Sequence, residues 1–153
     1  MVGDNGAEST GLALIKADPA KIWEEVLDYG ARVPESPNLE SATEYDRTGR
    51  TDWSVSMAVG VLAFSGELNL RFHWDEPGRW VSFTLDPARE NVMELADGHY
   101  RLDPLDGGWL LTYFMVSKPG IYVPGLVARN VAERDMAAMM GYLRARSEGK
   151  TTP

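Results

Sequence analysis

The side chain best placed for chemistry in this sequence is Asp135, an acidic residue inside an apolar stretch. A helix over 124–146, at about 100° per residue, would carry Asp135 within a broad apolar arc. A buried carboxylate needs a partner or water, so Asp135 lines a wet or ligand-bearing cavity, pairs with an inward Arg or Tyr, or reaches solvent. The other members of the arc are Val127, Val131, Ala132, Met136, Ala138, Met139, Tyr142 and Leu143.

Other reactive side chains are sparse. The two histidines, His73 and His99, show no ligand spacing, and the chain has no cysteine, so neither a metal site nor thiol chemistry is predicted. The sequence has no phosphate-binding glycine loop and no nucleophile elbow, and no cofactor is predicted. It therefore contains no self-evident catalytic set, which favours binding over catalysis.

The elements that must position these side chains begin with a strand and an early helix. GLALIKA (11–17) is a strand candidate, and it runs directly into Asp18 and Pro19, which indicate a helix start. Gly30 indicates the helix stop, and the proline-bearing segment GARVPESPNL (30–39) is a connector.

From Leu39 onward the pattern is that of strands. Apolar and polar side chains alternate, most clearly in GELNLRFHWDEPG, which indicates six strands joined by short turns. With the first strand they make seven antiparallel strands, followed by one long helix over 124–146. The strand WLLTYFMVS (109–117) is apolar on both faces, so its period does not assign an inward side.

Composition and charge narrow the class of protein. With 153 residues and 44% apolar content, we expect one domain over 11–147, between a disordered segment 1–10 and a flexible tail 148–153. The net charge of −8 argues against nucleic acid as a partner. The sequence shows neither a signal peptide nor a membrane-spanning run, so a cytoplasmic protein is predicted, with its oligomeric state undetermined.

Small residues and methionines on the expected long helix leave irregular space against the sheet. This space is either a cavity for a ligand or is filled by the larger strand side chains. Two loops of the predicted fold carry apolar residues at their tips. VGVLAFSG (59–66) reads as strand ends meeting in a tight turn, whereas KPGIYVPG (118–125), which carries Tyr122, reads as a lid that also allows transient membrane contact.

The order of elements resembles the START-like, or SRPBCC, superfamily with the helix-grip fold. The local motifs that carry the resemblance are IKADPAKIWEEVLD, VGVLAFSGELNL, DGHYRLDPLDGGWLLTYFM and VPGLVARNVAERDMAAMMGYLRAR, within residues 11–147. They are similar to the polyketide cyclase/dehydratase and lipid-transport branch, with coenzyme Q-binding proteins nearest in character. The resemblance implies an α+β fold, in which a seven-stranded curved antiparallel sheet wraps around a long C-terminal helix, with one or two short helices after the first strand.

The resemblance also implies a hydrophobic cavity between the sheet and the terminal helix. Its branch has no universal catalytic motif, so none is carried over, and Asp135 with Tyr100 or Tyr113 are candidate acid and base residues. The implied ligand-binding positions, together with Tyr122 of the lid loop, are Met57, Phe72, Trp74, Phe83, Tyr100, Tyr113, Asp135, Met136 and Met139.

Three functions follow as hypotheses. The leading one is binding, and transport or presentation, of a small hydrophobic molecule such as a lipid, quinone, sterol or polyketide. The first alternative is a polyketide aromatase/cyclase or dehydratase. The second alternative is a protein-partner module, such as an accessory factor or antitoxin, that uses the outer sheet face around Trp80, Arg71 and His73.

Overall fold

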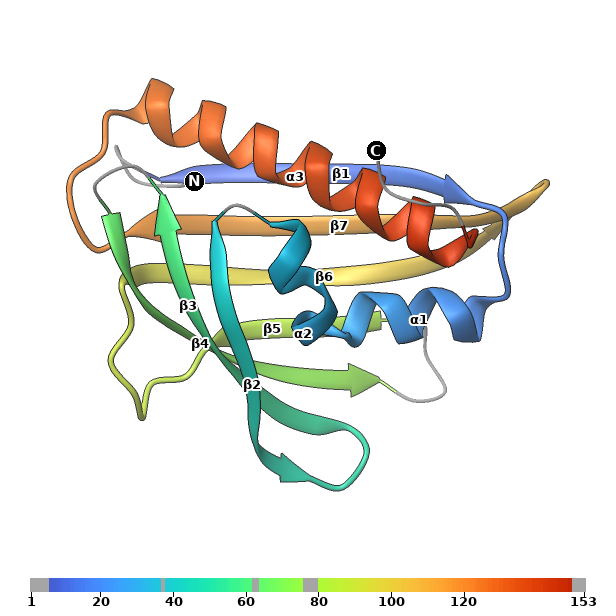
Figure 1. The fold of residues 1–153 in the computed structure, drawn as a ribbon, viewed down its shortest axis with the longest axis horizontal. Coiled ribbons are helices and arrows are strands. Elements are labelled where there is room, and N and C mark those ends of the chain that lie inside the picture. The colour runs from blue at the N-terminus through green and yellow to red at the C-terminus, as the bar shows by residue number, and fades with distance from the viewer. Residues whose placement is uncertain (1–5, 37, 62–63, 76–79, 150–153) are drawn as a thin grey trace.

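One antiparallel sheet carries helices on one of its faces (Figure 1). The computed structural model describes residues 6–36, 38–61, 64–75 and 80–149. In chain order the elements are β1 (Ala7–Ile15), α1 (Pro19–Leu27), α2 (Tyr29–Arg32), the short 3-10 helix η1 (Val33–Glu35), β2 (Leu39–Thr48), β3 (Asp52–Val61), β4 (Phe64–Asp75), β5 (Trp80–Leu85), β6 (Met93–Leu105), β7 (Gly108–Pro119) and α3 (Gly125–Ser147).

The sheet has seven strands in the order β1-β7-β6-β5-β4-β3-β2. Strands β2 to β7 form a meander, and β1 joins beyond β7, so that the first and last strands of the chain are neighbours. Asp18 caps α1 as its sequence position predicts, because its Oδ1 accepts a hydrogen bond from the Ala20 amide at 2.8 Å. The predicted fold class, a curved seven-stranded sheet with a long C-terminal helix and short helices after the first strand, is confirmed.

Strand β1 is longer than predicted. It starts at Ala7, and its register with β7 runs from Ala7 opposite Ser117 to Ile15 opposite Trp109. Residues 7–10, which we expected to be disordered, therefore belong to the sheet. The reason is tertiary: β7 is long enough to pair with residues whose own side chains are small and polar. Most of the predicted loop 59–66 lies in β3 and β4, and its tip at 62–63 is outside the described residues.

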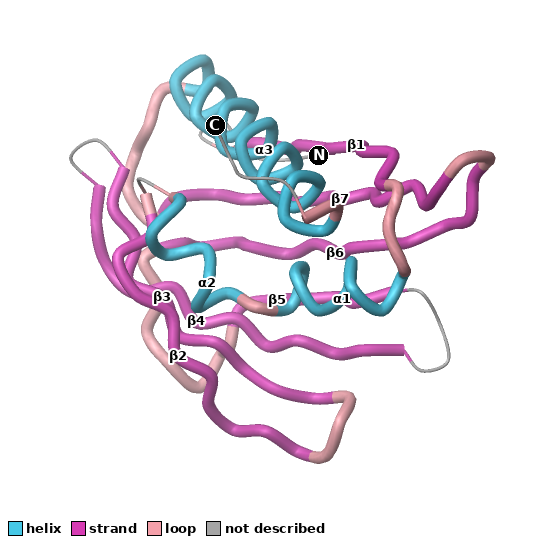
Figure 2. Tube along the Cα trace, turned by 45° about the vertical axis from the view of Figure 1, so that its right-hand side comes forward, coloured by secondary structure: helices cyan, strands magenta, loops and turns pink. Residues whose placement is uncertain are grey.

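Helix α3 packs on β1 through a glycine. A Cβ atom on Gly11 would lie 2.5 Å from Met140 Cγ and 2.7 Å from Met136 Sδ, so the missing side chain lets the helix approach. The views in Figures 1 and 2 show α3 running along β1 and β7, while α1 and α2 cover the middle of the sheet. The predicted arc of α3 is wrong at Asp135 and Ala138, which are exposed, and it left out Met140, which is buried.

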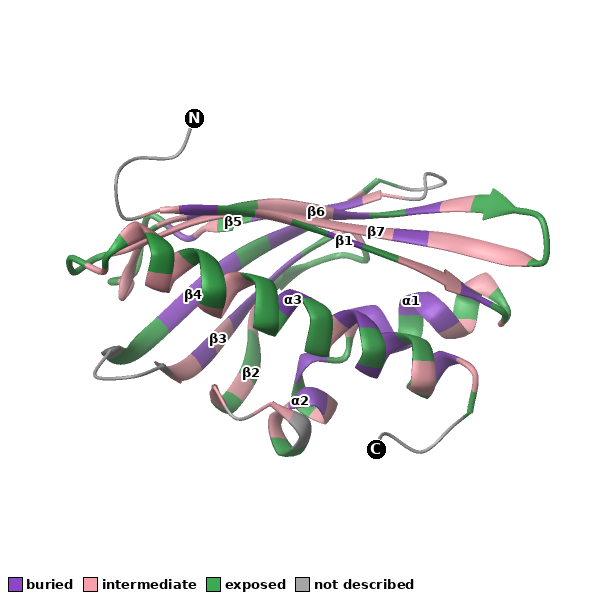
Figure 3. Cartoon of the chain, turned by 90° about the horizontal axis from the view of Figure 1, so that it is seen from above, coloured by how far each residue is buried: buried purple, intermediate pink, exposed green. Residues whose placement is uncertain are grey.

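The register between β6 and β7 determines the inward face of β7. Leu111, Tyr113 and Met115 lie opposite Leu102, Tyr100 and Gly98 of β6. Leu102 and Tyr100 are fully buried under the helices, so these three β7 side chains also face the helical layer. Figure 3 shows buried residues both on the strands and on the helices that cover them. Leu111, Tyr113 and Met115 are therefore the β7 side chains on the concave face of the sheet.

Candidate ligand-binding site

Four side chains, three of them buried and Tyr113 partly buried, form a polar cluster beneath α2. Tyr29 and Arg32 come from α2, Tyr100 from β6 and Tyr113 from β7, and we call them the tyrosine–arginine cluster. The Tyr29 and Tyr100 hydroxyl oxygens are 2.7 Å apart, and Arg32 Nη1 donates to the Tyr100 hydroxyl at 3.2 Å. The Tyr113 ring stacks on Tyr100 with centroids 4.3 Å apart. The cluster thus joins a four-residue helix to the centre of the sheet.

The charge of this cluster is unusual. Arg32 is only 1% exposed, and within the described residues no carboxylate forms an ion pair with it. Its Nη2 donates to the Val26 carbonyl, but its Nε is buried without a hydrogen-bond partner among the described residues. Burial alone would lower the pKa of Arg32, but the neighbouring tyrosines outweigh this effect and raise the pKa, so the guanidinium is cationic.

The tyrosines do not neutralise this cation. Burial raises the pKa of Tyr29 and of Tyr113 well above the usual value, so both phenols keep their protons at neutral pH. An unpaired ion in a protein interior costs on the order of several kcal/mol even after the surroundings relax. The interior therefore holds a positive charge that the described part of the chain leaves uncompensated.

A continuous row of aromatic rings leads away from the cluster. Phe72 of β4 touches Tyr29 edge-on at 5.2 Å between ring centroids, and on its other side it stacks on Trp53 at 5.6 Å. Phe83 of β5 packs against Phe72 at 5.7 Å and against Tyr100 at 5.9 Å. We call Trp53, Phe72 and Phe83 the aromatic row. Such a wall suits a flat or elongated apolar molecule.

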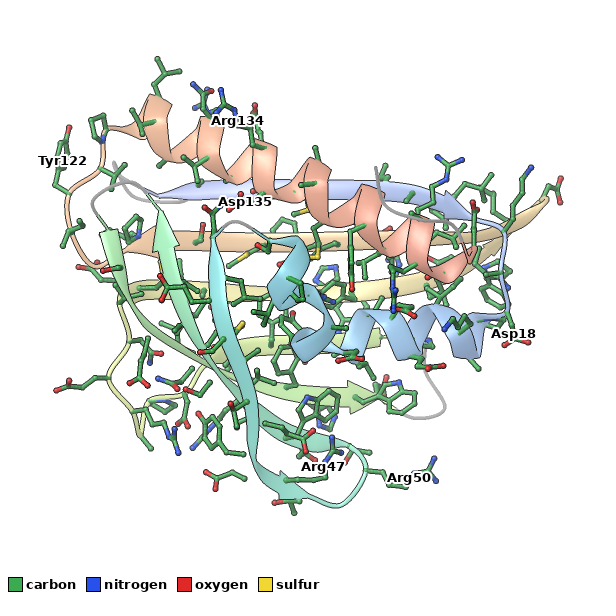
Figure 4. The ribbon with its side chains drawn as sticks, viewed as in Figure 1. Asp18, Arg47, Arg50, Tyr122, Arg134 and Asp135 are labelled. Atoms are coloured by element: carbon green, nitrogen blue, oxygen red, sulfur yellow. The ribbon has the colours of Figure 1, made fainter. Side chains whose placement is uncertain are left out.

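The row ends at an open pocket of about 250 Å³, which we call the outer pocket. The pocket is lined by Leu27, Glu44, Arg47, Arg50, Trp53 and Trp74. Figure 4 shows Arg47 and Arg50 at the β2–β3 end of the sheet.

Tryptophan rings and charged groups meet in the outer pocket. Arg47 Nε donates to Glu44 at 3.1 Å, and the Arg47 guanidinium lies 5.1 Å from the centroid of the Trp53 ring. The hydrogen bond from Arg47 lowers the pKa of Glu44, so the two groups form an ion pair. Trp74, which also lines this pocket, has its Nε1 buried without a partner among the described residues.

Comparisons with known proteins agree with this architecture. No protein-family profile matches the sequence, and no curated protein sequence does. A STAR-related lipid transfer protein from Xanthomonas axonopodis superposes with a TM-score of 0.77 at 18% identity, covering 90% of this chain and 84% of that one. A START superfamily protein from Mycobacterium smegmatis gives 0.76 at 15% identity, covering 93% and 97%.

A third solved structure is an enzyme. The Zhui aromatase/cyclase from a Streptomyces species superposes with a TM-score of 0.71 at 18% identity, covering 94% of each chain. This chain has the START-like fold. Within the described part of this START-like chain, no helix has the length and apolarity needed to cross a membrane.

The START-like fold brings four of the expected ligand-binding residues together. Phe72 and Phe83 belong to the aromatic row, and Tyr100 and Tyr113 to the tyrosine–arginine cluster. Trp74 lines the outer pocket instead. The remaining methionines among the expected residues lie in or against the hydrophobic core, and they are Met57, Met136 and Met139. Their contact with a ligand stays a prediction.

Two expected site residues lie elsewhere. Tyr122 is 77% exposed in the loop before α3 and does not line the interior (Figure 4). Asp135 is exposed as well, so it reaches solvent, and its Oδ1 accepts a hydrogen bond from Asn38 Nδ2 at 2.7 Å. Partial burial of the carboxylate raises the pKa of Asp135, and the Asn38 hydrogen bond opposes this effect.

The candidate pairing of Asp135 with Tyr100 or Tyr113 finds no support, because no contact joins them within the described ranges. The physical reason is the placement of α3, which packs on β1 through Gly11 and turns Asp135 toward the segment before β2. For the same reason the outer pocket lies away from α3, whereas the expected cavity lay beneath it.

Sequence reasoning missed the residues that give the site its charge. Arg32 lies in the segment 30–39 that we interpreted as a connector, and the four-residue helix α2 is too short to show a period. Arg47 lies near the end of β2 and Arg50 in the turn after it, where charged residues are ordinary. A signal was present in Arg32 itself, a cation between the apolar residues Ala31 and Val33, but it did not reveal burial.

The outer, convex face uses its polar residues within the chain. Arg71 pairs with Asp86 at 3.1 Å, and His73 Nδ1 lies 2.9 Å from Asp52. Trp80 stacks on the His99 ring with centroids 4.0 Å apart. These contacts within the chain account for the presence of Arg71, His73 and Trp80 on this face without a partner protein. The partner-module hypothesis stays a prediction.

Proposed function

We propose that this protein binds a small hydrophobic molecule on the concave face of its sheet, beneath α1 and α2, and transports or presents it. The observation that carries the proposal is the continuous aromatic wall from the outer pocket to the tyrosine–arginine cluster. A core that only stabilises the fold needs no buried hydrogen-bond donor without a partner, and Arg32 Nε is such a donor among the described residues, at the end of this wall. The lipid transfer protein with a similar fold supports the same reading.

Filling the outer pocket tests this proposal. Leu27→Trp adds a ring to the pocket wall, and we expect it to weaken ligand binding at least about tenfold, because the ligand and the new ring compete for one volume. Binding is measured by quenching of tryptophan fluorescence and by thermal shift with fatty acids, sterols, quinones and naphthols. Native mass spectrometry of protein purified from its host identifies a bound molecule directly.

The matched control is Leu12→Trp, the same change at a position that is 63% exposed on β1. We expect this variant to bind like the wild type. Equal weakening in both variants would place the ligand outside the outer pocket. Failure of every compound to bind, together with empty native mass spectra, would remove the proposal.

A second candidate function is polyketide cyclisation or dehydration. Arg32 and the Tyr100 hydroxyl together present donors in an apolar interior, and such donors polarise a carbonyl group as negative charge develops on its oxygen. The aromatase/cyclase with a similar fold makes this chemistry a natural comparison.

Tyr100→Phe tests the enzymatic candidate. If the hydroxyl acts in the reaction, we expect turnover of a poly-β-keto mimic to fall by roughly 100-fold, since one preorganised donor contributes about that much. Tyr122→Phe, at an exposed position, is the control and should leave turnover unchanged. Absence of turnover by the wild type, or equal rates in all three proteins, would exclude this candidate.

A further inference from the structure

Arg32 is the feature of the interior that hydrophobic binding alone does not explain. An apolar ligand needs no cation, yet this guanidinium is 1% exposed, and its Nε has no hydrogen-bond partner in the described part of the chain. Its two other nitrogens are used by the Tyr100 hydroxyl and the Val26 carbonyl, which are neutral acceptors. A charge-assisted bond to an anion would satisfy both the charge and the unused N–H group.

We propose that Arg32 binds an anionic oxygen of the ligand, so that the preferred ligands are apolar organic acids with a carboxylate at the end that reaches Arg32. This inference rests on the proposed function and narrows its ligand class. The planar guanidinium matches a carboxylate in shape, and whichever of the Tyr29 and Tyr100 hydroxyls accepts the bond between them keeps a proton to donate.

Ring-to-ring contacts of the aromatic row run from the outer pocket to this anion site. Trp53 both lines the outer pocket and begins the row, and Phe72 links it to Tyr29, whose ring lies 4.0 Å from the Arg32 guanidinium carbon. The apolar body of the acid lies along the row, and its carboxylate lies at the cluster.

Local charge distinguishes Arg32 from the cations of the outer pocket. Arg47 already pairs with Glu44, which removes much of its attraction for a second anion. The net charge of −8 repels acids from the protein as a whole. A preference for acids must therefore come from a specific local site, and Arg32 is the buried cation for which the described residues provide no counter-charge.

The test compares matched ligand pairs on the full chain. Dodecanoate is compared with dodecanol, and 2-naphthoate with its methyl ester, by fluorescence titration at pH 7. For the wild type we expect the acid to bind at least about tenfold more tightly than its neutral partner, the range for a hydrogen bond to a charged group. In Arg32→Met we expect this ratio to fall to about one, because the acid loses the cation that distinguishes it from its neutral partner.

Two further variants separate charge recognition from a structural role. Arg47→Met, the same change in the outer pocket, is expected to keep the acid preference. Arg32→Lys keeps the charge without the planar fork, is expected to retain part of the preference, and serves as the reporter if Arg32→Met does not fold. A structural role alone would lower the melting temperature of the ligand-free Arg32 variants and leave the acid-to-neutral ratio unchanged.

Each outcome is decisive. Loss of the preference in Arg32→Met but not in Arg47→Met supports the inference. Equal binding of acids and neutral analogues by the wild type overturns it while leaving the proposed function intact. Loss of preference in Arg47→Met alone overturns it too, since the anion would then lie in the outer pocket. Failure of all four probes to bind contradicts both proposals.

Discussion

Phe72→Ala is expected to lower the free energy of unfolding by about 3–5 kcal/mol, the range for deleting a buried aromatic ring. Phe72 is 2% exposed and contacts three other rings, those of Trp53, Tyr29 and Phe83. Its removal leaves a cavity at the centre of the aromatic row, because the pairing of β4 with β3 and β5 holds Trp53 and Phe83 in place on either side. Denaturant unfolding followed by circular dichroism measures the change.

Phe114→Ala is the matched control for this prediction. Phe114 lies on the convex face of β7, is partly exposed, and stacks on His99 with ring centroids 5.4 Å apart. We expect its loss to cost about 1 kcal/mol, the scale of one aromatic pair. Equal losses at the two positions would show that the aromatic row does not form the centre of the core.

The second large effect is expected at Asp86, which is 1% exposed at the end of β5. Its Oδ2 accepts from the Tyr45 hydroxyl at 2.7 Å, its Oδ1 accepts from the Ala88 amide at 2.9 Å, and Arg71 pairs with Oδ1 at 3.1 Å. Asp86→Ala leaves these donors without their acceptor, and we expect the free energy of unfolding to fall by about 2–4 kcal/mol at pH 7. Asp52→Ala, which removes an exposed pair with His73, should change stability little.

The pH dependence of this effect follows from the direction of the pKa shift. Burial alone would raise the pKa of Asp86, but the Tyr45 and Ala88 hydrogen bonds and the charge of Arg71 outweigh it and lower the pKa. The stabilisation is therefore fully present above the unfolded value of about 3.9 and is lost as the pH falls through the lower folded value. The stability difference between wild type and Asp86→Ala should be constant from pH 7 to 5 and shrink below about pH 4. A difference that grows in acid would contradict this sign.

The two faces of the sheet carry different groups of contacts. Phe72 and Arg71 are adjacent on β4 and point to opposite faces, since side chains alternate along a strand. The concave face carries the aromatic row and the tyrosine–arginine cluster, while on the convex face Arg71 and Asp86 hold the segment after β5. Ligand-site variants and loop variants can therefore be examined independently.

Local pattern was sufficient for most of the fold. The alternation of Leu68, Leu70, Phe72 and Trp74 assigned the inward face of β4, and all four side chains lie in or against the core. Asp18 and Pro19 marked the start of α1, and the long apolar arc predicted α3 to within a residue or two at each end. These features are visible in sequence because each depends on neighbours a few residues away.

Only the tertiary structure decided the site. The inward face of β7 depends on its register with β6, and the start of β1 depends on the length of β7. The burial of Arg32 depends on α2 folding onto Tyr100, which is 68 residues later in the chain. Contacts of this kind leave no periodic trace, since they are set by how distant elements pack. The sequence by itself therefore determined a START-like sheet with its long helix. Packing determined that the cation of Arg32 is buried beside the aromatic row.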